Sequence, residues 1–318
     1  MTGLIDQILD RSVVGGFSSI GYSIRRRLPT WPADAAPNSL QGKTALVTGA
    51  SSGLGISTAA GLGQLGAKVL LVVRDVRKGE QVAHTLRHSI DAEFEVVRCD
   101  LADLNDVRRF SAHLSEPSID VLIHNAGALP PTRQESAQGH ELTMALHVLA
   151  PVLMTELLAE KLTPAARIVF VTSGGMYSQR LRADDPDFLD GDYSGTTAYA
   201  RSKRAQIELM PILTQRWAPA RVYATHPGWA DTPGVKESIP AFEKLTRPIL
   251  RDAESGADTT VWLSATEPAP APATLWHDRV ARPTHFMART RTGDLERRRM
   301  WNWVQEHLVE LREPHPDV

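Results

Sequence analysis

Tyr199 and Lys203 lie four residues apart in the segment TTAYARSKRAQ, and Ser173 lies upstream in FVTSGG. A separation of four places the tyrosine and the lysine on one face of a helix. Lowering a tyrosine pKa from roughly 10 to about 7 requires about 4 kcal/mol of phenolate stabilisation, and an exposed contact supplies only about 0.3 to 1 kcal/mol. We therefore expect proton transfer to or from an oxygen, in a partly dry cleft where the ammonium stands close to the phenol.

A glycine-rich turn near the start of the chain can hold a phosphate. Residues 43–49, KTALVTG, predict a short strand, and ASSGLG then opens a helix, with Gly49, Gly53 and Gly55 on the turn. Without Cβ atoms, these residues let backbone amides approach a pyrophosphate at the helix N-terminus. The spacing differs from the G-x-G-x-x-G of many dinucleotide folds. The strand before it and the helix after it favour phosphate binding over a merely flexible turn.

Strand and helix patterns alternate along the chain. Strands are expected near residues 44–48, 67–73, 93–98, 119–124, 166–172, 220–225 and 274–277. Continuous apolar runs such as VLLVV suit a parallel sheet that is covered on both faces. The sequence therefore predicts an α/β fold with a single doubly wound parallel sheet, Rossmann-like, and helices on both faces. Ligands of such folds bind beyond the carboxyl ends of the strands, where Ser173, Asn125 and Pro227 fall.

Five motifs in order resemble the short-chain dehydrogenase/reductase superfamily: TGxxxGxG from Thr48 to Gly55, NAG at 125–127, Ser173, YxxxK from Tyr199 to Lys203, and PG at 227–228 with Thr232. The resemblance covers roughly residues 41–290. It implies an oxidoreductase in which Ser173 binds the substrate oxygen, Tyr199 transfers the proton, and Lys203 holds the cofactor ribose and lowers the tyrosine pKa. The cofactor-binding residues that it implies are Gly49, Ser51, Ser52, Gly53, Leu54, Gly55, Arg74, Asp100, Leu101, Asn125, Ala126, Gly127, Tyr199, Lys203, Pro227, Gly228, Trp229 and Thr232.

Residues at the end of the second strand indicate whether the protein binds NADP(H) or NAD(H). Arg74 and Asp75 give opposite signals, because arginine binds a 2′-phosphate and an acidic residue binds the ribose hydroxyls. Against related enzymes, Val73 falls at the NAD-selecting aspartate position and Arg74 one residue beyond it. NADP(H) is therefore favoured, with NAD(H) as the alternative. The resemblance also places Asp100 at the adenine amino group, where a helix cap is the alternative.

His147 departs from the family pattern. The helix around it aligns without gaps with a family helix that carries asparagine at this position. In the family, that residue distorts the helix, and its main-chain carbonyl holds a water that contacts the active lysine. The histidine either keeps this backbone role, relays protons through its imidazole, or marks weakened catalysis. The last alternative would make the protein an NAD(P)-binding regulatory or scaffold protein with little turnover.

The chain divides into an N-terminal extension with a proline-rich linker (1–40), the short-chain dehydrogenase domain (41–310) and a tail (311–318). Apolar residues recur at helical spacing through residues 4–28. We expect a helix packed on its own domain or on a second copy in a homo-oligomer; an interfacial membrane helix, with Arg25, Arg26 and Arg27 at the headgroups, is the alternative. A substrate lid is expected near 229–250, whose apolar stripe favours a small lipophilic carbonyl or alcohol.

Composition narrows the partners and the compartment. The 35 basic residues are balanced by 37 acidic ones, so nucleic-acid binding is not expected. The single cysteine, Cys99, excludes an internal disulfide framework and suits the cytoplasm. His84 and His88 form an i, i+4 pair with no third ligand arranged around them, and no metal site is expected.

Overall fold

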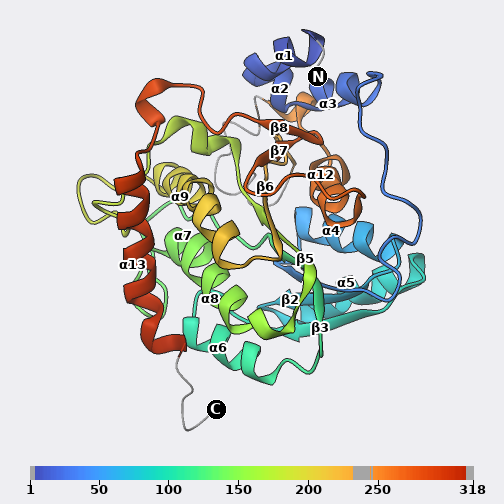
Figure 1. The fold of residues 1–318 in the computed structure, drawn as a ribbon, viewed down its shortest axis with the longest axis horizontal. Helices are drawn as coiled ribbons and strands as arrows, with labels where there is room; N and C mark the ends of the chain where they lie inside the picture. Colours follow the sequence, from blue (N-terminus) through green and yellow to red (C-terminus); the bar gives the residue numbers. More distant parts are fainter. Residues whose placement is uncertain (1–3, 232–243, 245, 313–318) are drawn as a thin grey trace.

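The computed structural model describes residues 4–231, 244 and 246–312. Thr232 and most of the predicted lid lie outside these residues. Within them, eight strands form one sheet in the order β3-β2-β1-β4-β5-β6-β7-β8 (Figure 1). The strands are β1 Thr44–Thr48, β2 Lys68–Val73, β3 Phe94–Arg98, β4 Ile119–His124, β5 Leu162–Val171, β6 Arg221–Thr225, β7 Leu275–His277 and β8 Val280–Arg282.

The strand pairing confirms the predicted doubly wound sheet. Every neighbouring pair is parallel except the terminal pair of β7 and β8. Strand β8 was not predicted; it is three residues long and forms a hairpin through Asp278 and Arg279, both at positive φ. The order reverses at β1, which pairs with β2 on one side and β4 on the other. A crevice for a ligand is expected beyond the carboxyl ends of strands at such a reversal.

Helices cover both faces of the sheet (Figure 1). The helices that follow the first strand are α4 Gly53–Gln64, α5 Val76–Ser89, α6 Leu104–His113, α7 Leu142–Met144, α8 Ala150–Leu157, α9 Gly195–Arg216, α12 Ala253–Ala265 and α13 Asp294–Arg312. Single turns occur at η2 Ala159–Lys161, η3 Gly174–Ser178, η4 Arg247–Ile249 and η5 Ala288–Thr290. A π-helical turn, η1 Ala145–Leu149, joins α7 to α8.

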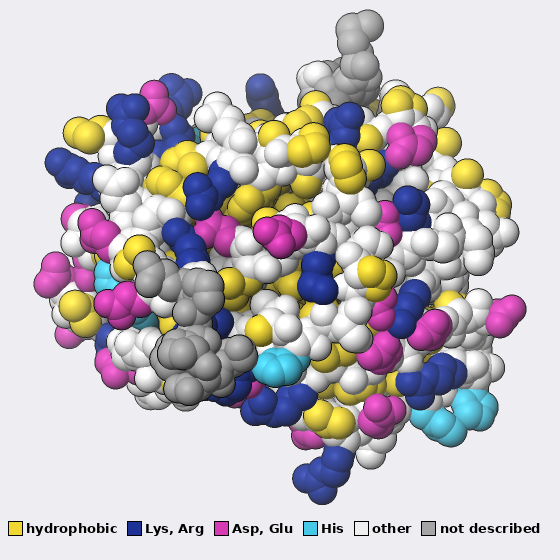
Figure 2. All heavy atoms as spheres, turned by 60° about the horizontal axis from the view of Figure 1, so that its bottom comes forward, with side chains coloured by type: hydrophobic (Ala, Val, Ile, Leu, Met, Phe, Trp, Pro, Cys, Tyr) yellow, Lys and Arg dark blue, Asp and Glu magenta, His cyan; other side chains and the backbone are white. Residues whose placement is uncertain are grey.

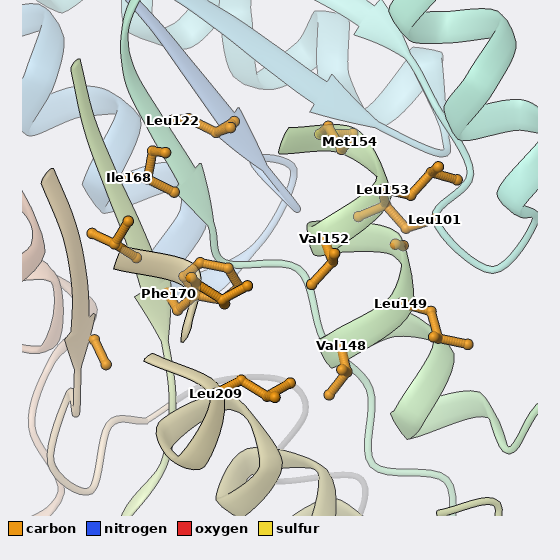
Figure 3. Close-up of a cluster of buried hydrophobic side chains, with 14 of the residues drawn as sticks. Leu101, Leu122, Val148, Leu149, Val152, Leu153, Met154, Ile168, Phe170 and Leu209 are labelled. Carbon is orange, nitrogen blue, oxygen red and sulfur yellow. The ribbon is translucent and has the colours of Figure 1, made fainter. Parts of the chain in front are cut away.

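Two hydrophobic clusters fill the layers between helices and sheet. Because side chains alternate along a strand, Leu46 faces one cluster and Val47 the other. The first cluster packs the sheet against α6, α8, α9 and α13, and Figure 3 shows Val148, Val152 and Phe170 within it. The second packs the sheet against α4, α5 and α12. These cores fix the strand ends and the helices that follow them.

The N-terminal extension forms three short helices, α1 Leu4–Arg11, α2 Val13–Phe17 and α3 Ser19–Arg26, instead of one. The helix is interrupted at Ser12 and at Ser18. The Ser18 side chain accepts a hydrogen bond from the amide of Gly21 at the start of α3. The helices pack beside the β7–β8 hairpin (Figure 1). The expectation that Arg25 reaches lipid headgroups is wrong, because its side chain is 2% exposed and pairs with Asp6 and Asp278.

The molecular surface mixes the two signs of charge. Basic and acidic side chains are interspersed across the face drawn in Figure 2. The part of the chain that the structure describes contains no helix both long and apolar enough to cross a membrane.

Candidate active site

Lys203 contacts the end of strand β5, which Ser173 follows. The Lys203 Nζ donates a hydrogen bond to the carbonyl of Val171 at 2.8 Å, and the Thr172 hydroxyl donates to the carbonyl of Lys203 at 3.1 Å. These contacts join α9 to the strand end that Ser173 follows. Lys203 is 3% exposed, and burial lowers its pKa to about 7. The amino group therefore stands in the dry surroundings expected from the sequence, where burial disfavours its charged form.

Tyr199 lies one turn before Lys203 on α9. The Lys203 Nζ is 5.7 Å from the centre of the tyrosine ring. Dense packing around the phenol raises the pKa of Tyr199, and a hydrogen bond with the Ser173 side chain acts in the opposite direction. The three residues are thus brought together, although burial outweighs the stabilisation of the phenolate. A neutral Tyr199 is the form that can donate a proton.

The glycine-rich turn is tied to the NAG segment. Gly49 has φ of 68°, and a Cβ at this position would lie 2.8 Å from Cα of Ala126. The Asn125 side-chain amide donates to the carbonyl of Thr48 at 3.0 Å, and the backbone amides of Asn125 and Ala126 both donate to the Thr48 hydroxyl. This packing explains why the turn accepts no side chain at Gly49.

The first turn of α4 fits an anionic group. Gly53, at φ of 48°, is its first residue, and Ser52 occupies the N-cap position without a side-chain capping hydrogen bond. Ser51, Leu54 and Gly55 complete the segment. An α-helix leaves its first amide hydrogens without partners inside the helix, and its dipole favours negative charge there. The residues present therefore fit the pyrophosphate of a dinucleotide.

Arg74 and Asp75 take different roles at the end of β2. Arg74 is exposed, and no ion pair joins it to another described residue. Asp75 is the N-cap of α5, where its carboxylate accepts from the amide of Lys78 at 3.2 Å. The acidic side chain is thus engaged within the protein, and the basic one is available to a phosphate.

Asp100 and Leu101 lie in a turn after β3. An Asp100 carboxylate oxygen accepts from the amide of Ala102 at 3.0 Å, while Asp103 caps α6. Asp100 therefore shapes a turn rather than capping the helix. Leu101 is buried in the core near Leu153 (Figure 3), so its side chain does not line an open surface. The adenine contacts of both residues stay predictions.

His147 lies in the π-helical turn η1, where the gapless alignment expected a distorted helix. Its carbonyl accepts from the Gln206 side-chain amide at 2.7 Å. Its Nδ1 is 2.8 Å from the hydroxyl of Ser202, and that hydroxyl donates to the carbonyl of Tyr199. Because a hydroxyl has only one hydrogen, Nδ1 must be the donor, which leaves Nε2 as an acceptor.

The imidazole of His147 is therefore held neutral. It is fully buried, and burial together with the charge of Lys203 lowers its pKa well below the ordinary value. No hydrogen-bond partner of Nε2 occurs among the described residues, and a Cβ at Gly127 would lie 2.7 Å from it. Sequence reasoning did not assign Ser202 or Gln206, although their positions after Tyr199 place them on α9.

Arg204 was also missed, because an arginine after the lysine of the motif resembles a surface charge. Its side chain is fully buried and donates to the carbonyls of Met176, Gln179 and Thr284. It also pairs with Glu208 at 3.4 Å. Arg204 thereby fixes the segment that follows Ser173.

Pro227, Gly228 and Trp229 follow β6 after His226, whose imidazole lies against Gly174, the residue after Ser173. Gly228 has φ of 76°, and the amide of Trp229 donates to the carbonyl of Phe17 at 2.8 Å. Most of the predicted site residues thus lie beyond the carboxyl ends of β1, β2, β3, β4, β5 and β6. Thr232 is outside the described residues.

Comparison with known proteins identifies the class. A family model described as short chain dehydrogenase matches residues 43–183. Dehydrogenase/reductase SDR family member 12 of Bos taurus is 34% identical over 295 residues, covering 88% of this chain and 89% of that protein. Retinol dehydrogenase 11 of Mus musculus is 34% identical, covering 72% of this chain and 75% of that protein. The chain belongs to the short-chain dehydrogenase/reductase family, whose members are oxidoreductases that bind NAD(P).

Solved structures agree with this assignment. An uncharacterized protein from Mycobacterium Paratuberculosis matches with a TM-score of 0.69 and 27% identity, over 88% of this chain and 100% of that one. The Pseudomonas aeruginosa RhlG/NADP active-site complex matches with a TM-score of 0.61 and 25% identity, over 75% of this chain and 96% of that one. The fold expected from the motifs is therefore confirmed.

Proposed function

We propose that this protein is an NADP(H)-dependent oxidoreductase acting on a lipophilic alcohol or carbonyl compound. The observation that carries the proposal is the meeting of Ser173, Tyr199 and Lys203 at the end of β5. When bound, the cofactor supplies or accepts the hydride. The turn from Gly49 to Gly55 would hold its pyrophosphate, and Arg74 its 2′-phosphate.

The protein's own groups handle the proton and the substrate oxygen. The Ser173 hydroxyl donates a hydrogen bond to that oxygen, and Tyr199, kept protonated by burial, donates the proton in the reductive direction. The buried Lys203 ammonium stabilises the phenolate left behind, because its charge acts in a low dielectric. In the oxidative direction the same phenolate receives the proton.

The choice of cofactor rests on Arg74, which is exposed, and on Asp75, whose carboxylate already caps α5. A charge-assisted hydrogen bond contributes about 1.5 to 3 kcal/mol. Arg74→Ala should therefore weaken NADPH binding by roughly tenfold to a hundredfold and leave NADH binding nearly unchanged. Titration of nucleotide fluorescence measures both. Tighter binding of NADH than NADPH by the unmodified protein would show that the assignment is wrong.

A lipophilic substrate is supported by the aromatic residues near Ser173. Tyr177 stacks on Phe286, with ring centres 4.3 Å apart, and Trp229 packs against Phe17. Retinol dehydrogenase 11 is among the relatives, and its name gives an apolar alcohol as substrate. A panel of carbonyl compounds of increasing apolar area tests this class: turnover efficiency should rise with that area, and a preference for small polar carbonyls would contradict it.

We also propose peripheral contact of the otherwise cytoplasmic protein with an anionic membrane through residues 4–28. Isoleucines on the outer sides of α1 and α3 are exposed, Ile5 by 53%, Ile8 by 60%, Ile20 by 54% and Ile24 by 38%. Arg26 and Arg27, also exposed, would face acidic headgroups. Co-sedimentation with anionic vesicles should fall in the doubly substituted I20S/I24S protein, and equal pelleting of both proteins would refute the contact.

A further inference from the structure

The N-terminal extension reaches the candidate active site through Phe17. This residue ends α2, and its side chain is 6% exposed. Its ring centre lies 4.4 Å from that of His226 and 6.2 Å from that of Trp229. Its carbonyl accepts the amide hydrogen of Trp229 at 2.8 Å. Phe17 therefore contacts the turn that follows β6, which includes Pro227 and Gly228.

The same ring lies under the other site loop. A Cβ added to Gly174, the residue after Ser173, would lie 3.1 Å from Cε2 of Phe17. A Cβ added to Gly228 would lie 2.7 Å from the Phe17 carbonyl oxygen and 2.4 Å from Nε of Arg251. The nearest atom to a Cβ at Gly174 is Nε2 of His226, at 2.8 Å, so the Ser173 loop packs on His226 as well as on Phe17. The Ser173 loop and the turn after β6 thus share a packing partner that lies more than 150 positions earlier in the sequence.

Buried ion pairs hold Phe17 in this place. Arg251 donates to the carbonyls of Gly16, Phe17 and Ser18 at 3.1, 3.0 and 3.2 Å. It also pairs with Asp278 at 2.6 Å, and Asp278 pairs with Arg25 of α3 at 2.7 Å. The backbone of Arg251 donates to the carbonyl of Trp229 at 2.7 Å. One arginine therefore links the extension, the hairpin and the turn after β6.

We propose that Phe17 is a positioning residue for the reaction, which fixes the distance between the Ser173 loop and the Pro227–Trp229 turn. The inference rests on the proposed function, in which Ser173 holds the substrate oxygen and the turn lies against the cofactor. Loss of the ring leaves a void beneath Gly174 into which the loop can move. Because small displacements of a bound oxygen slow a reaction strongly, carbonyl turnover depends on this ring. Among the described residues, Phe17 contacts Trp229 but neither the Gly49–Gly55 turn nor Arg74, which would hold the phosphates, so carbonyl turnover depends on the ring more strongly than nucleotide affinity does.

The test compares Phe17→Leu and Phe17→Ala with Phe110→Leu and Phe110→Ala in the full chain. Phe110, on α6, is equally buried at 6% and belongs to the core away from the site loops. Hydrogen exchange of peptides covering residues 173–179 and 226–231 is the first readout. We expect about tenfold faster exchange there in Phe17→Ala only, as a favoured local opening produces. Equal exchange in the Phe17 and Phe110 variants would overturn the proposal.

Kinetics give the second readout. Phe17→Ala should lower kcat/KM for a carbonyl substrate by about tenfold to a hundredfold. NADPH affinity should fall by less than kcat/KM does, because the residues that would hold the phosphates do not touch Phe17. Phe17→Leu should recover part of the loss. An equal loss in the Phe110 variants would show a general effect of stability and overturn the proposal. If the unmodified protein reduces no carbonyl compound, the proposed function fails, while the exchange comparison still decides whether Phe17 fixes the loops.

Discussion

Asp278→Asn tests the buried charge network that attaches the N-terminal extension. Asp278 is 1% exposed and faces Arg25 and Arg251, which are 2% and 1% exposed. Asparagine keeps the shape of the side chain and also tolerates the residue's φ of 51°. The substitution therefore removes one negative charge and little else. The guanidinium groups of Arg25 and Arg251 then stay buried without the carboxylate that both of them pair with.

The expected loss of stability follows from the burial. Removing one partner of a buried ion pair costs about 3 to 5 kcal/mol, because the remaining charge is neither hydrated nor paired. Asp34→Asn is the control: Asp34 pairs with Arg279 at 2.6 Å, but its carboxylate is 79% exposed, and exposed pairs contribute about 0 to 1 kcal/mol.

Urea denaturation at pH 7, followed by circular dichroism, measures the free energy of unfolding of both variants. We expect Asp278→Asn to lose several times more than Asp34→Asn. A loss below about 1 kcal/mol in Asp278→Asn would refute the reasoning, because a loss that small is typical of an exposed pair.

Two further predictions concern buried histidines. Burial lowers the pKa of His124 to about 3 and of His277 to about 4, whereas an unfolded histidine titrates near 6.5. Below that pH the unfolded chain binds more protons than the folded one. The free energy of unfolding should therefore fall from pH 6.5 toward 4 by about 1.4 kcal/mol per pH unit for each histidine. Urea midpoints that stay constant over this range would contradict this prediction. His147→Asn should keep kcat/KM within about tenfold and remove no ionisation near pH 6 to 7 from the rate profile. The reason is that the neutral imidazole is not expected to titrate there. Loss of such an ionisation would show that the imidazole relays protons.

The sequence predicted the parts of the site that depend on local spacing. Tyr199 and Lys203 are one helical turn apart, and the glycines of the first turn need only a strand before them and a helix after them. Contacts between segments far apart in the sequence could not be predicted from local spacing. Arg25, Arg251 and Asp278 resemble surface charges in the sequence, because nothing local shows that they are buried against one another.

The same limit applies to Phe17 and to strand β8. The apolar spacing that includes Phe17 predicts one amphipathic helix, whereas the structure breaks it at Ser12 and Ser18 and directs the ring toward the site. Strand β8 has three residues, too few for an alternating pattern to be recognised. Ser202 lies within the predicted catalytic helix, but its partner His147 is 55 residues earlier.

The central claim is that Tyr199 transfers the proton in an NADPH-dependent carbonyl reduction. The most direct measurement compares the turnover of Tyr199→Phe with that of Tyr193→Phe. Tyr193 is the control, because its hydroxyl donates a hydrogen bond to Glu141 at 2.9 Å and not to Ser173. We predict that Tyr199→Phe loses at least about a hundredfold in kcat while NADPH affinity persists, and that Tyr193→Phe stays active, because general acid catalysis contributes a factor of that size. Unchanged turnover in Tyr199→Phe would contradict the mechanism.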